Sequence, residues 1–516
     1  MVLYHVITTY HLMSAMTHQA RYRTEAVLMI PFWFKEKFPR IGELEKHFTQ
    51  VVFADAHYRF HNDARATAHY YRSLIGDPAQ YTDIYVWGAQ YSFGISLAEQ
   101  NAPFTFCEEG AGVLSRPQIL ENIDAKLKEK QFDRIKALGL FDGSAACVKK
   151  RMCNISAQTE DFCRQAHPDT ILHFDIISAL SQIDEAVRQE IIGFFVAPGT
   201  IRFPGGACLL LTQQFASLKI LSFSQQVLLY QLAVDYFFSR EQLVIKPHPD
   251  DIMYYRRLFP EAQIIRERFP SEFLPFILDH QPDCVATVSS TAIFNLRGHY
   301  PRVFELDTRY EKQFPMTHRY FAAVTLAQRL GLPLVCVGAN EVLAQRLGET
   351  LDGQSPAVTV CGADGPDGPC LLLIDDVTGQ GEAGRARVRA LLDGLPAGSC
   401  AVLLNTQGDF CWYDYDRREL WARMAPLTLE KRRLAAEGED FYAPLEEETI
   451  YIYSQDKELL DMAKETRIEK ELPHTGLHVS TAVFTPEQER IKMLEGILAA
   501  TERRLLYYIE KEREAK

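Results

Sequence analysis

The chain has 516 residues, which is too long for one hydrophobic core, so about two to four domains are expected. Hydrophobic residues make up 47% of it and charged residues 24%, the proportions of an ordinary folded, soluble protein. The net charge of −13 argues against a general nucleic-acid binder, which would carry a basic surface. An anionic substrate stays compatible, because a local basic pocket can exist within an acidic whole.

The N-terminal residues 1–7 lack the basic segment, long apolar core and cleavage site of a signal peptide. No apolar stretch approaches the length that spans a bilayer. The eleven cysteines are scattered without CxxC pairs, which predicts mostly buried thiols in a reducing compartment and no metal site. We therefore expect a cytoplasmic protein, with peripheral contact at the inner face of the membrane as an option.

Residues 1–200 alternate short apolar runs with amphipathic stretches, the rhythm of βαβ units and a mostly parallel sheet. The predicted strands are Leu3–Thr8, Glu25–Ile30, Gln50–Ala54, Ile84–Trp87 and Pro103–Cys107. The predicted helices are His18–Tyr22, Asp63–Ile75 and Ser92–Glu99, and a more helical, polar region follows from about residue 118 to 189.

The same rhythm starts again in residues 201–330, after the turn Pro204-Gly205-Gly206. The predicted strands are 207–213, Gln242–Lys246, Gln263–Ile265, Asp283–Val288 and Arg302–Leu306. The predicted helices are Gln225–Phe238, Ile252–Phe259, Glu272–Asp279 and Ala292–His299. Two Rossmann-like sheets in tandem, with polar loops at their strand ends, predict a cleft that both share.

Residues 331–475 change character and predict a smaller accessory α/β domain. Strands are expected at Val335–Ala339, Ala357–Val360, Leu371–Ile374 and Ala401–Leu404, and a helix at Glu341–Leu351. Residues 476–516 end in a predicted helix, Pro486–Lys516. Its apolar side carries Ile491, Leu494, Ile497, Leu498, Leu505, Tyr508 and Ile509. Its balanced charge favours packing or a homo-oligomer over membrane attachment.

The first candidate motif is Glu108-Glu109-Gly110, which follows an apolar strand. A carboxylate at a strand end can take a proton from an attacking hydroxyl, particularly if partial burial raises its pKa. Glycine lets the backbone approach a substrate closely. The alternative is a pair of acids that simply favours a helix N-terminus.

The second motif is Lys246-Pro247-His248-Pro249. Flanking prolines hold the backbone of His248 extended, and Lys246 two residues earlier would then face the same way. The lysine could supply charge to a phosphate and the histidine a proton to the leaving oxygen. The alternative is a surface turn whose Asp250 and Asp251 cap a following helix.

The third motif, Ser289-Ser290-Thr291, lies between a predicted strand and a predicted helix. Hydroxyls and free N–H groups there form an anion site, although simple N-capping explains them equally well. Gln213, in Thr212-Gln213-Gln214 at the end of the first strand of the second sheet, is a further candidate phosphate contact.

Together, the three motifs resemble those of the bacterial sialyltransferases of glycosyltransferase families 52, 38 and 80, which carry an acidic pair followed by Gly, a His-Pro pair and a Ser/Thr cluster in this order. The resemblance covers roughly residues 1–307 and looks closest to the lipooligosaccharide and capsular polysialic-acid branches. It implies a GT-B fold and inverting transfer of sialic acid, or a related nonulosonic acid, from a CMP donor to a glycan hydroxyl.

Carried over residue by residue, the resemblance makes Glu109 the general base and His248 the group that assists departure of CMP. The donor-binding residues would be Lys246, Pro249, Ser289, Ser290, Thr291, Gln213 and Gly110. No metal or other cofactor is implied. A GT-B transferase that uses CMP-Kdo or another nucleotide sugar, and a non-catalytic sugar-nucleotide or glycan-binding protein, stay open as alternatives.

Three further patterns carry less weight. Asp414-Tyr415-Asp416 is formally the DxD of metal-dependent transferases, but it lies outside both predicted sheets. Gly338-Ala339-Asn340 follows a strand without the GxGxxG glycines of a dinucleotide loop. The histidines His5, His11 and His18 lack zinc-site spacing, although His11, in a loop with Thr8, could face the cleft.

Overall fold

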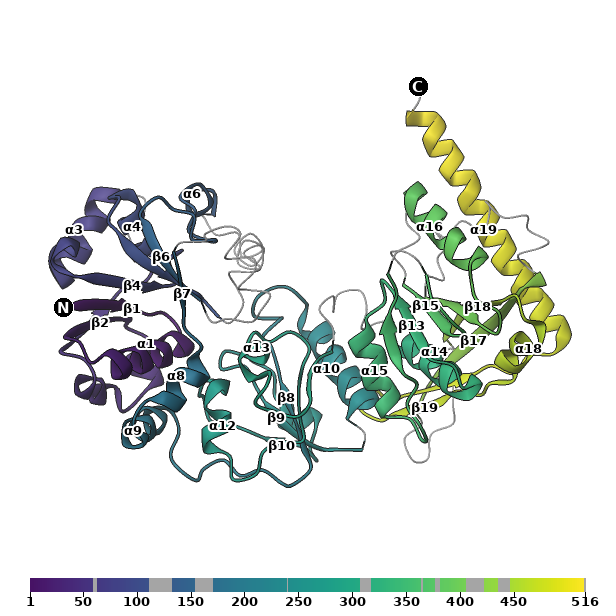
Figure 1. The fold of residues 1–516 in the computed structure, drawn as a ribbon, viewed down its shortest axis with the longest axis horizontal. Coiled ribbons are helices and arrows are strands. Elements are labelled where there is room, and N and C mark those ends of the chain that lie inside the picture. Colours follow the sequence, from purple (N-terminus) through teal and green to yellow (C-terminus); the bar gives the residue numbers. More distant parts are fainter. Residues whose placement is uncertain are drawn as a thin grey trace. The chain divides into compact units, whose positions relative to one another are not determined.

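The computed structural model describes residues 1–58, 63–110, 132–153, 170–238, 240–306, 317–362, 365–375, 381–404, 422–434 and 446–514 (Figure 1). It divides into two compact units. The first unit contains residues 1–223, 242–256 and 261–303, and the second contains 224–241, 257–260 and 304–516.

The first sheet has seven parallel strands in the order β3-β2-β1-β4-β5-β6-β7. The strands are β1 (Val2–His5), β2 (Ala26–Pro31), β3 (Gln50–Ala54), β4 (Asp83–Trp87), β5 (Phe104–Cys107), β6 (Val148–Cys153) and β7 (Ile171–His173). Tyr4 packs into one apolar cluster and its neighbour Leu3 into a second. Because successive side chains of a strand point to opposite faces, the sheet has a core on each side.

The helices around this sheet are α1 (Thr9–Tyr22), α2 (Phe34–Lys37), α3 (Ala64–Ile75), α4 (Ser92–Glu99), α6 (Phe132–Ala137), α8 (Ile176–Gln182) and α9 (Glu185–Phe195), with a 3₁₀ helix η1 at Ile41–Lys46 and a second, η2, at Pro78–Gln80. The prediction for the first helix is wrong at its start. Thr8 accepts a hydrogen bond from the backbone N–H of His11 and begins α1 at Thr9, so the predicted loop around His11 is the first helical turn.

The second sheet has the order β10-β9-β8-β11-β12, and Figure 1 labels β8, β9 and β10 of it. Its strands are β8 (Ala207–Leu211), β9 (Gln242–Lys246), β10 (Gln263–Ile264), β11 (Cys284–Thr287) and β12 (Val303–Glu305). Strands β8, β9, β10 and β11 pair in parallel, so the α/β class with two parallel Rossmann-like sheets in tandem is confirmed. Both sheets contain a topological switch point, between β1 and β4 in the first and between β8 and β11 in the second.

The helices of this region are shorter than predicted, except α10 (Phe223–Phe237). The others are α11 (Tyr255–Leu258), η3 (Ser271–Phe273), α12 (Leu274–Ile277) and α13 (Ala292–Leu296). The predicted helix at 252–259 begins only at Tyr255, because Asp251 accepts from the N–H of Met253 and from the Tyr255 hydroxyl and holds a turn there.

Cys208 and Cys284 correct the prediction for the cysteines. They are direct partners on the neighbouring strands β8 and β11 and form a disulfide that closes 76 residues of sequence. The prediction of buried thiols holds for the described free cysteines Cys107, Cys147, Cys153, Cys336, Cys370 and Cys400, whereas Cys361 is half-buried.

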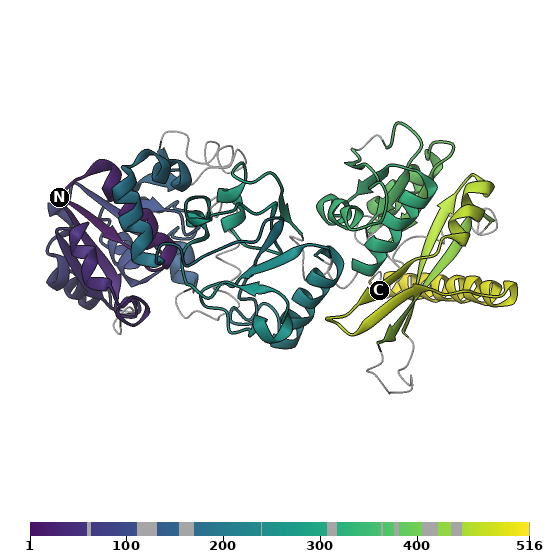
Figure 2. The ribbon, with the colours of Figure 1, turned by 90° about the horizontal axis from the view of Figure 1, so that it is seen from below.

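The third sheet lies in the second unit and is mixed (Figures 1 and 2). Its parallel strands are β14 (Val358–Val360), β13 (Leu334–Val337), β15 (Leu371–Ile374) and β16 (Cys400–Leu403). Its antiparallel strands are β18 (Glu446–Ser454), β17 (Met424–Arg433), β20 (Leu477–Thr481) and β19 (Glu469–Leu472), which the sequence did not predict. The helices are α14 (Thr317–Leu330), α15 (Glu341–Glu349), α16 (Gly381–Asp393), α18 (Lys457–Glu465) and α19 (Pro486–Glu514). Within the described part of the chain, none of the helices has the length and apolarity that crossing a membrane requires.

Candidate functional site

Glu109 lies at the carboxyl edge of the first sheet, just after β5 and beside the end of β4. Its side chain is 18% exposed. Burial raises the pKa of the Glu109 carboxyl to about 7, while hydrogen bonds from Gln90 and the backbone of Gly88 act in the opposite direction. Its Oε2 is buried and has no hydrogen-bond partner among the residues that the structure describes. A carboxyl with this pKa and with an oxygen that makes no hydrogen bond is suited to accept a proton near neutral pH.

His11 fixes the backbone beside this carboxyl, a role that the sequence did not predict. Its Nδ1 accepts from the N–H groups of Ile7 and Thr8, each at 3.2 Å. Burial lowers the pKa of the His11 ring to about 3, so the ring is neutral and carries its proton on Nε2. That nitrogen donates to the Glu109 carbonyl oxygen at 3.0 Å and lies 3.5 Å from Oε2. The ring therefore holds the backbone of Glu109 in place and brings no positive charge close to its carboxyl group.

His248 lies at the carboxyl edge of the second sheet, two residues beyond β9. Its backbone N–H donates to the Thr212 hydroxyl at 3.3 Å, and its Nδ1 accepts from the N–H of Asp250 at 3.2 Å. Burial lowers the pKa of the ring to about 4, helped by Lys246 and opposed by Asp250 and Asp251. His248 is therefore neutral at pH 7, with its proton on Nε2, and can donate a hydrogen bond from that atom.

Asp250, in the turn after His248, contacts a residue of the region that contains the first sheet. Its carboxylate pairs with Lys37, at the end of α2, at 3.0 Å. One apolar cluster also runs across both parts of the unit, with Phe194 and Phe195 of α9 and Phe273 of η3 among its members. The turn that carries His248 is thus tied to both sheets of the first unit.

Lys246 has a different setting from the one predicted. Its side chain is buried, and its Nζ donates to the Phe269 carbonyl oxygen at 2.8 Å and lies 4.5 Å from the centre of the Phe269 ring. Burial lowers the pKa of the amine to about 8, against the opposing effect of Glu272. Side chains two residues apart face the same way only within a strand, and β9 ends at Lys246. The strand geometry therefore does not make Lys246 and His248 point in the same direction. The role of Lys246 as a phosphate ligand stays a prediction, and we expect its contribution to be small, because the amine is already bound to the Phe269 carbonyl oxygen.

The switch point of the second sheet brings Gln213 and Ser289 together. They follow the neighbouring strands β8 and β11, and the Gln213 side-chain amide donates to the Ser289 carbonyl oxygen at 3.3 Å. Thr291 stands at the N-cap of α13, but its side chain makes no capping hydrogen bond, and all three hydroxyl residues of the motif are half-exposed. The capping alternative therefore does not account for the Thr291 hydroxyl.

The predicted residues thus fall into two groups on the first unit. The group of the first sheet contains Glu109 and Gly110, with His11 added by the structure. The group of the second sheet contains His248, Pro249, Gln213, Ser289, Ser290 and Thr291, and Thr212 of the predicted Thr212-Gln213-Gln214 motif joins it through its hydrogen bond with His248. In both groups the residues follow the carboxyl ends of parallel strands, where α/β sheets bind ligands.

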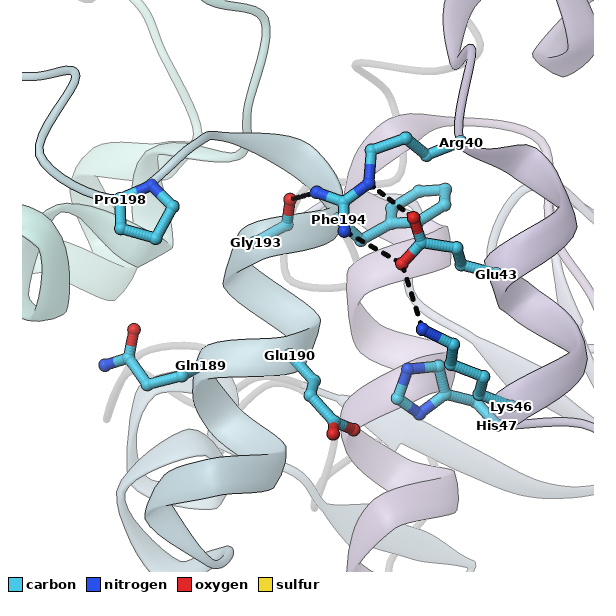
Figure 3. A pocket seen from close by; sticks show the side chains of 9 residues that line it. All are labelled: Arg40, Glu43, Lys46, His47, Gln189, Glu190, Gly193, Phe194 and Pro198. Atoms are coloured by element: carbon cyan, nitrogen blue, oxygen red, sulfur yellow. Dashed lines mark hydrogen bonds and ion pairs between the residues drawn. The ribbon is translucent and has the colours of Figure 1, made fainter.

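A cavity of about 240 Å³ lies elsewhere in this unit, between η1 and α9 (Figure 3). Three of its charged groups are paired with one another: Glu43 binds both Arg40 and Lys46, and Arg40 also donates to the Gly193 carbonyl oxygen. The predicted site residues do not line it. This cavity is therefore separate from the candidate site.

The remaining predicted patterns have structural roles or lie outside the described residues. Asn340 caps α15 by accepting from the Leu343 N–H at 3.0 Å, so the loop at Gly338 serves a helix start. His5 contacts the Trp87 carbonyl oxygen, and His18 contacts the Tyr4 hydroxyl. Asp414, Tyr415 and Asp416 lie outside the described residues.

Comparisons with known proteins give a sparse background. No family model matches the chain. An uncharacterized protein of Haemophilus influenzae is 36% identical over 98 residues, which are 19% of this chain and 30% of that protein. The chain thus matches less than a third of that relative's length.

Several solved structures are similar in fold at low identity. The α/β-galactoside α-2,3-sialyltransferase of Photobacterium phosphoreum matches with a TM-score of 0.39 and 12% identity, over 61% of this chain and 94% of that one. The UDP-GlcNAc 2-epimerase of Neisseria meningitidis matches with a TM-score of 0.40 and 11% identity, over 62% and 86%. A sialyltransferase from Photobacterium damsela matches with a TM-score of 0.31 and 12% identity, over 57% and 71%. Because these scores are low, the function must be inferred from the site residues.

Proposed function

We propose that this chain is an inverting GT-B glycosyltransferase that moves sialic acid, or a related nonulosonic acid, from its CMP donor to a glycan hydroxyl in the synthesis of a bacterial surface polysaccharide or lipooligosaccharide. The observation that carries this proposal is the setting of Glu109 at a sheet's ligand-binding edge: its carboxyl has a pKa of about 7, and its buried Oε2 makes no hydrogen bond to the residues that the structure describes. A neutral histidine and a hydroxyl cluster at the corresponding edge of the second sheet support it.

In this reaction the acceptor oxygen attacks the anomeric carbon of the donor sugar. As that bond forms, the acceptor's proton passes to the Glu109 carboxylate, and the bond between the anomeric carbon and the CMP phosphate oxygen breaks. The electron pair of the broken bond leaves with CMP. One displacement of this kind inverts the anomeric centre.

His11 acts as a positioning residue for the base. Its neutral Nε2–H group holds the Glu109 carbonyl oxygen, and its Nδ1 is held by two backbone N–H groups. A protonated imidazolium in this position would favour the ionised carboxylate and lower its pKa. The neutral ring fixes the geometry and leaves the pKa of Glu109 raised.

His248 serves the leaving group. With a pKa of about 4, the ring is uncharged at pH 7. It can therefore donate a hydrogen bond from Nε2, but it brings no positive charge to the phosphate. A hydrogen bond of this kind strengthens as negative charge develops on the departing phosphate oxygen. We assign the hydroxyls of Ser289, Ser290 and Thr291, together with Gln213, to the same phosphate.

The test is release of CMP from CMP-sialic acid by the purified full chain, with water and a panel of glycans as acceptors. CMP-Kdo and UDP-GlcNAc are offered in parallel. The proposal predicts CMP release from CMP-sialic acid that Glu109→Gln slows by about 10³-fold, whereas Glu43→Gln, in the separate cavity, retains it. Turnover of CMP-Kdo or UDP-GlcNAc alone would favour another GT-B transferase. Binding of CMP without any turnover would favour the non-catalytic alternative and overturn the proposal.

A further inference from the structure

The C-terminal helix α19 has one face that the second unit uses. It spans 29 residues, about 43 Å at the rise of an α-helix. Met493 packs against the apolar core of the third sheet, and Lys492 pairs with Glu447 of β18 at 2.7 Å. Gly496 lies against Tyr451, whose hydroxyl occupies the space that a Cβ would need. This side of the helix is its attachment to the sheet.

The opposite face of α19 is apolar and exposed. Ile491, Leu494, Leu498, Leu505 and Tyr508 are between 51% and 62% exposed. At 100° per residue they centre on the side of the helix away from Gly496. Exposed apolar side chains in a continuous row on a monomeric surface indicate an interaction site.

The spacing of this row is that of a coiled coil. Taking Ile491 as position a of a heptad, the a positions are Ile491, Leu498 and Leu505, and the d positions are Leu494, Thr501 and Tyr508. Thr501, at the middle d position, is polar, but its hydroxyl already has a hydrogen-bond partner within the helix. It donates to the Ile497 carbonyl oxygen at 2.7 Å. Thr501 can therefore present its methyl group to a partner helix.

The charges of α19 favour a second copy of the same helix. The helix carries seven acidic and six basic residues, so it lacks the excess of basic residues that attracts a helix to an anionic membrane surface. In a parallel, in-register pair, Arg490 at position g faces Glu495 at position e of the partner helix. In the antiparallel pair that aligns the same apolar row, Glu495 would face Glu502 of the partner, and like charges repel.

We propose that α19 pairs with α19 of a second copy as a parallel two-stranded coiled coil, and that the chain is a dimer through this helix. The proposal is independent of the transfer chemistry, because it draws on α19 of the second unit and the candidate site lies in the first unit. The dimer would bury the apolar row that the single chain leaves exposed.

The experiment measures the mass of the full chain by light scattering at tens of micromolar protein. The wild type is expected at twice the chain mass of 58.9 kDa, and Leu498→Glu at the chain mass. Leu506→Glu is the matched control: Leu506 is 57% exposed on the same helix but occupies position b, so this variant is expected to stay dimeric. A wild type at the chain mass, or a dimer that survives Leu498→Glu, would overturn the proposal.

A cysteine at position 491 tests the direction of the pair. In a parallel dimer the two copies of Ile491 meet at position a, so Ile491→Cys is expected to cross-link on mild oxidation, whereas the wild type is not. In the antiparallel pair, position 491 lies opposite 508 and does not cross-link with itself. Flotation with vesicles of phosphatidylcholine and phosphatidylglycerol tests the membrane alternative: a monomeric wild type that floats, and loses this property in Leu498→Glu, would assign the row to a membrane.

Discussion

The carboxyl edges of the first two sheets hold their polar groups in contrasting ways. At the first, Glu109 is partly exposed as a residue, but its Oε2 atom is buried, and its own carbonyl oxygen is held by a buried, neutral His11. At the second, the residues Ser289, Ser290 and Thr291, which carry the hydroxyls, are half-exposed. A proton acceptor needs a dry, fixed setting that raises its pKa, whereas a phosphate site needs donors that a ligand can reach from solvent. The two edges match these two requirements, and four substitutions test the contrast.

The largest effect is expected for Glu109→Gln. The amide keeps the shape of the side chain but cannot accept the acceptor's proton, so kcat should fall about 10³-fold. CMP affinity, measured by calorimetry, should change little, because our proposal assigns the donor phosphate to residues of the other edge. A variant with near-wild-type kcat would show that the carboxyl has only a structural role.

His248→Ala should lower kcat about 10²-fold, because it removes a hydrogen bond that strengthens in the transition state. His248→Gln, which keeps an N–H donor, should lose less. A donor with a better leaving group should partly rescue His248→Ala, and should not rescue Glu109→Gln to the same degree. If only KM rises, the ring positions CMP without assisting its departure.

His11→Ala should lower kcat about tenfold and shift the pH dependence of the reaction. Loss of the ring admits water to Glu109, which lowers the pKa of the carboxyl and moves the acidic limb of the kcat profile to lower pH. If kcat falls but the acidic limb of its pH profile stays at the same pH, His11 has only a structural role. Its removal should also cost roughly 1–3 kcal/mol in the free energy of unfolding.

Lys246→Met should have the smallest effect on the donor. Its amine is already bound to the Phe269 carbonyl oxygen, so CMP affinity should stay near that of the wild type. The free energy of unfolding should fall by roughly 1–3 kcal/mol, because the carbonyl loses its buried partner. A large loss of CMP affinity in a folded Lys246→Met variant would restore lysine as a phosphate ligand and weaken the contrast between the edges.

Much of the fold could be predicted from the sequence, because strands of a parallel sheet are buried on both faces and form continuous apolar runs. Gln50–Ala54, Gln242–Lys246 and Leu371–Ile374 were predicted with the bounds that the structure gives them. The antiparallel strands β17 to β20 were missed, since segments such as Glu446–Ser454 and Glu469–Leu472 begin with charged residues and form no continuous apolar run.

The site could be predicted only in part. The motifs at strand ends located Glu109 and His248, but His11 and Glu109 are 98 residues apart and meet through the sheet topology, which no local pattern shows. The one local signal for His11 was its spacing from Thr8, three residues earlier, which starts the helix. The direction of Lys246 depended on the end of β9, and strand bounds are the least certain part of such a prediction.

The most direct test of the account is the pH dependence of kcat for CMP release in the wild type and in Glu109→Gln. A base must be deprotonated to act, so a pKa raised to about 7 predicts that wild-type kcat rises through about pH 7 and levels off above it. His248, with a pKa of about 4, adds no second limb near neutrality. The account predicts that the limb near pH 7 disappears in Glu109→Gln; the same limb in the variant's residual activity would contradict it.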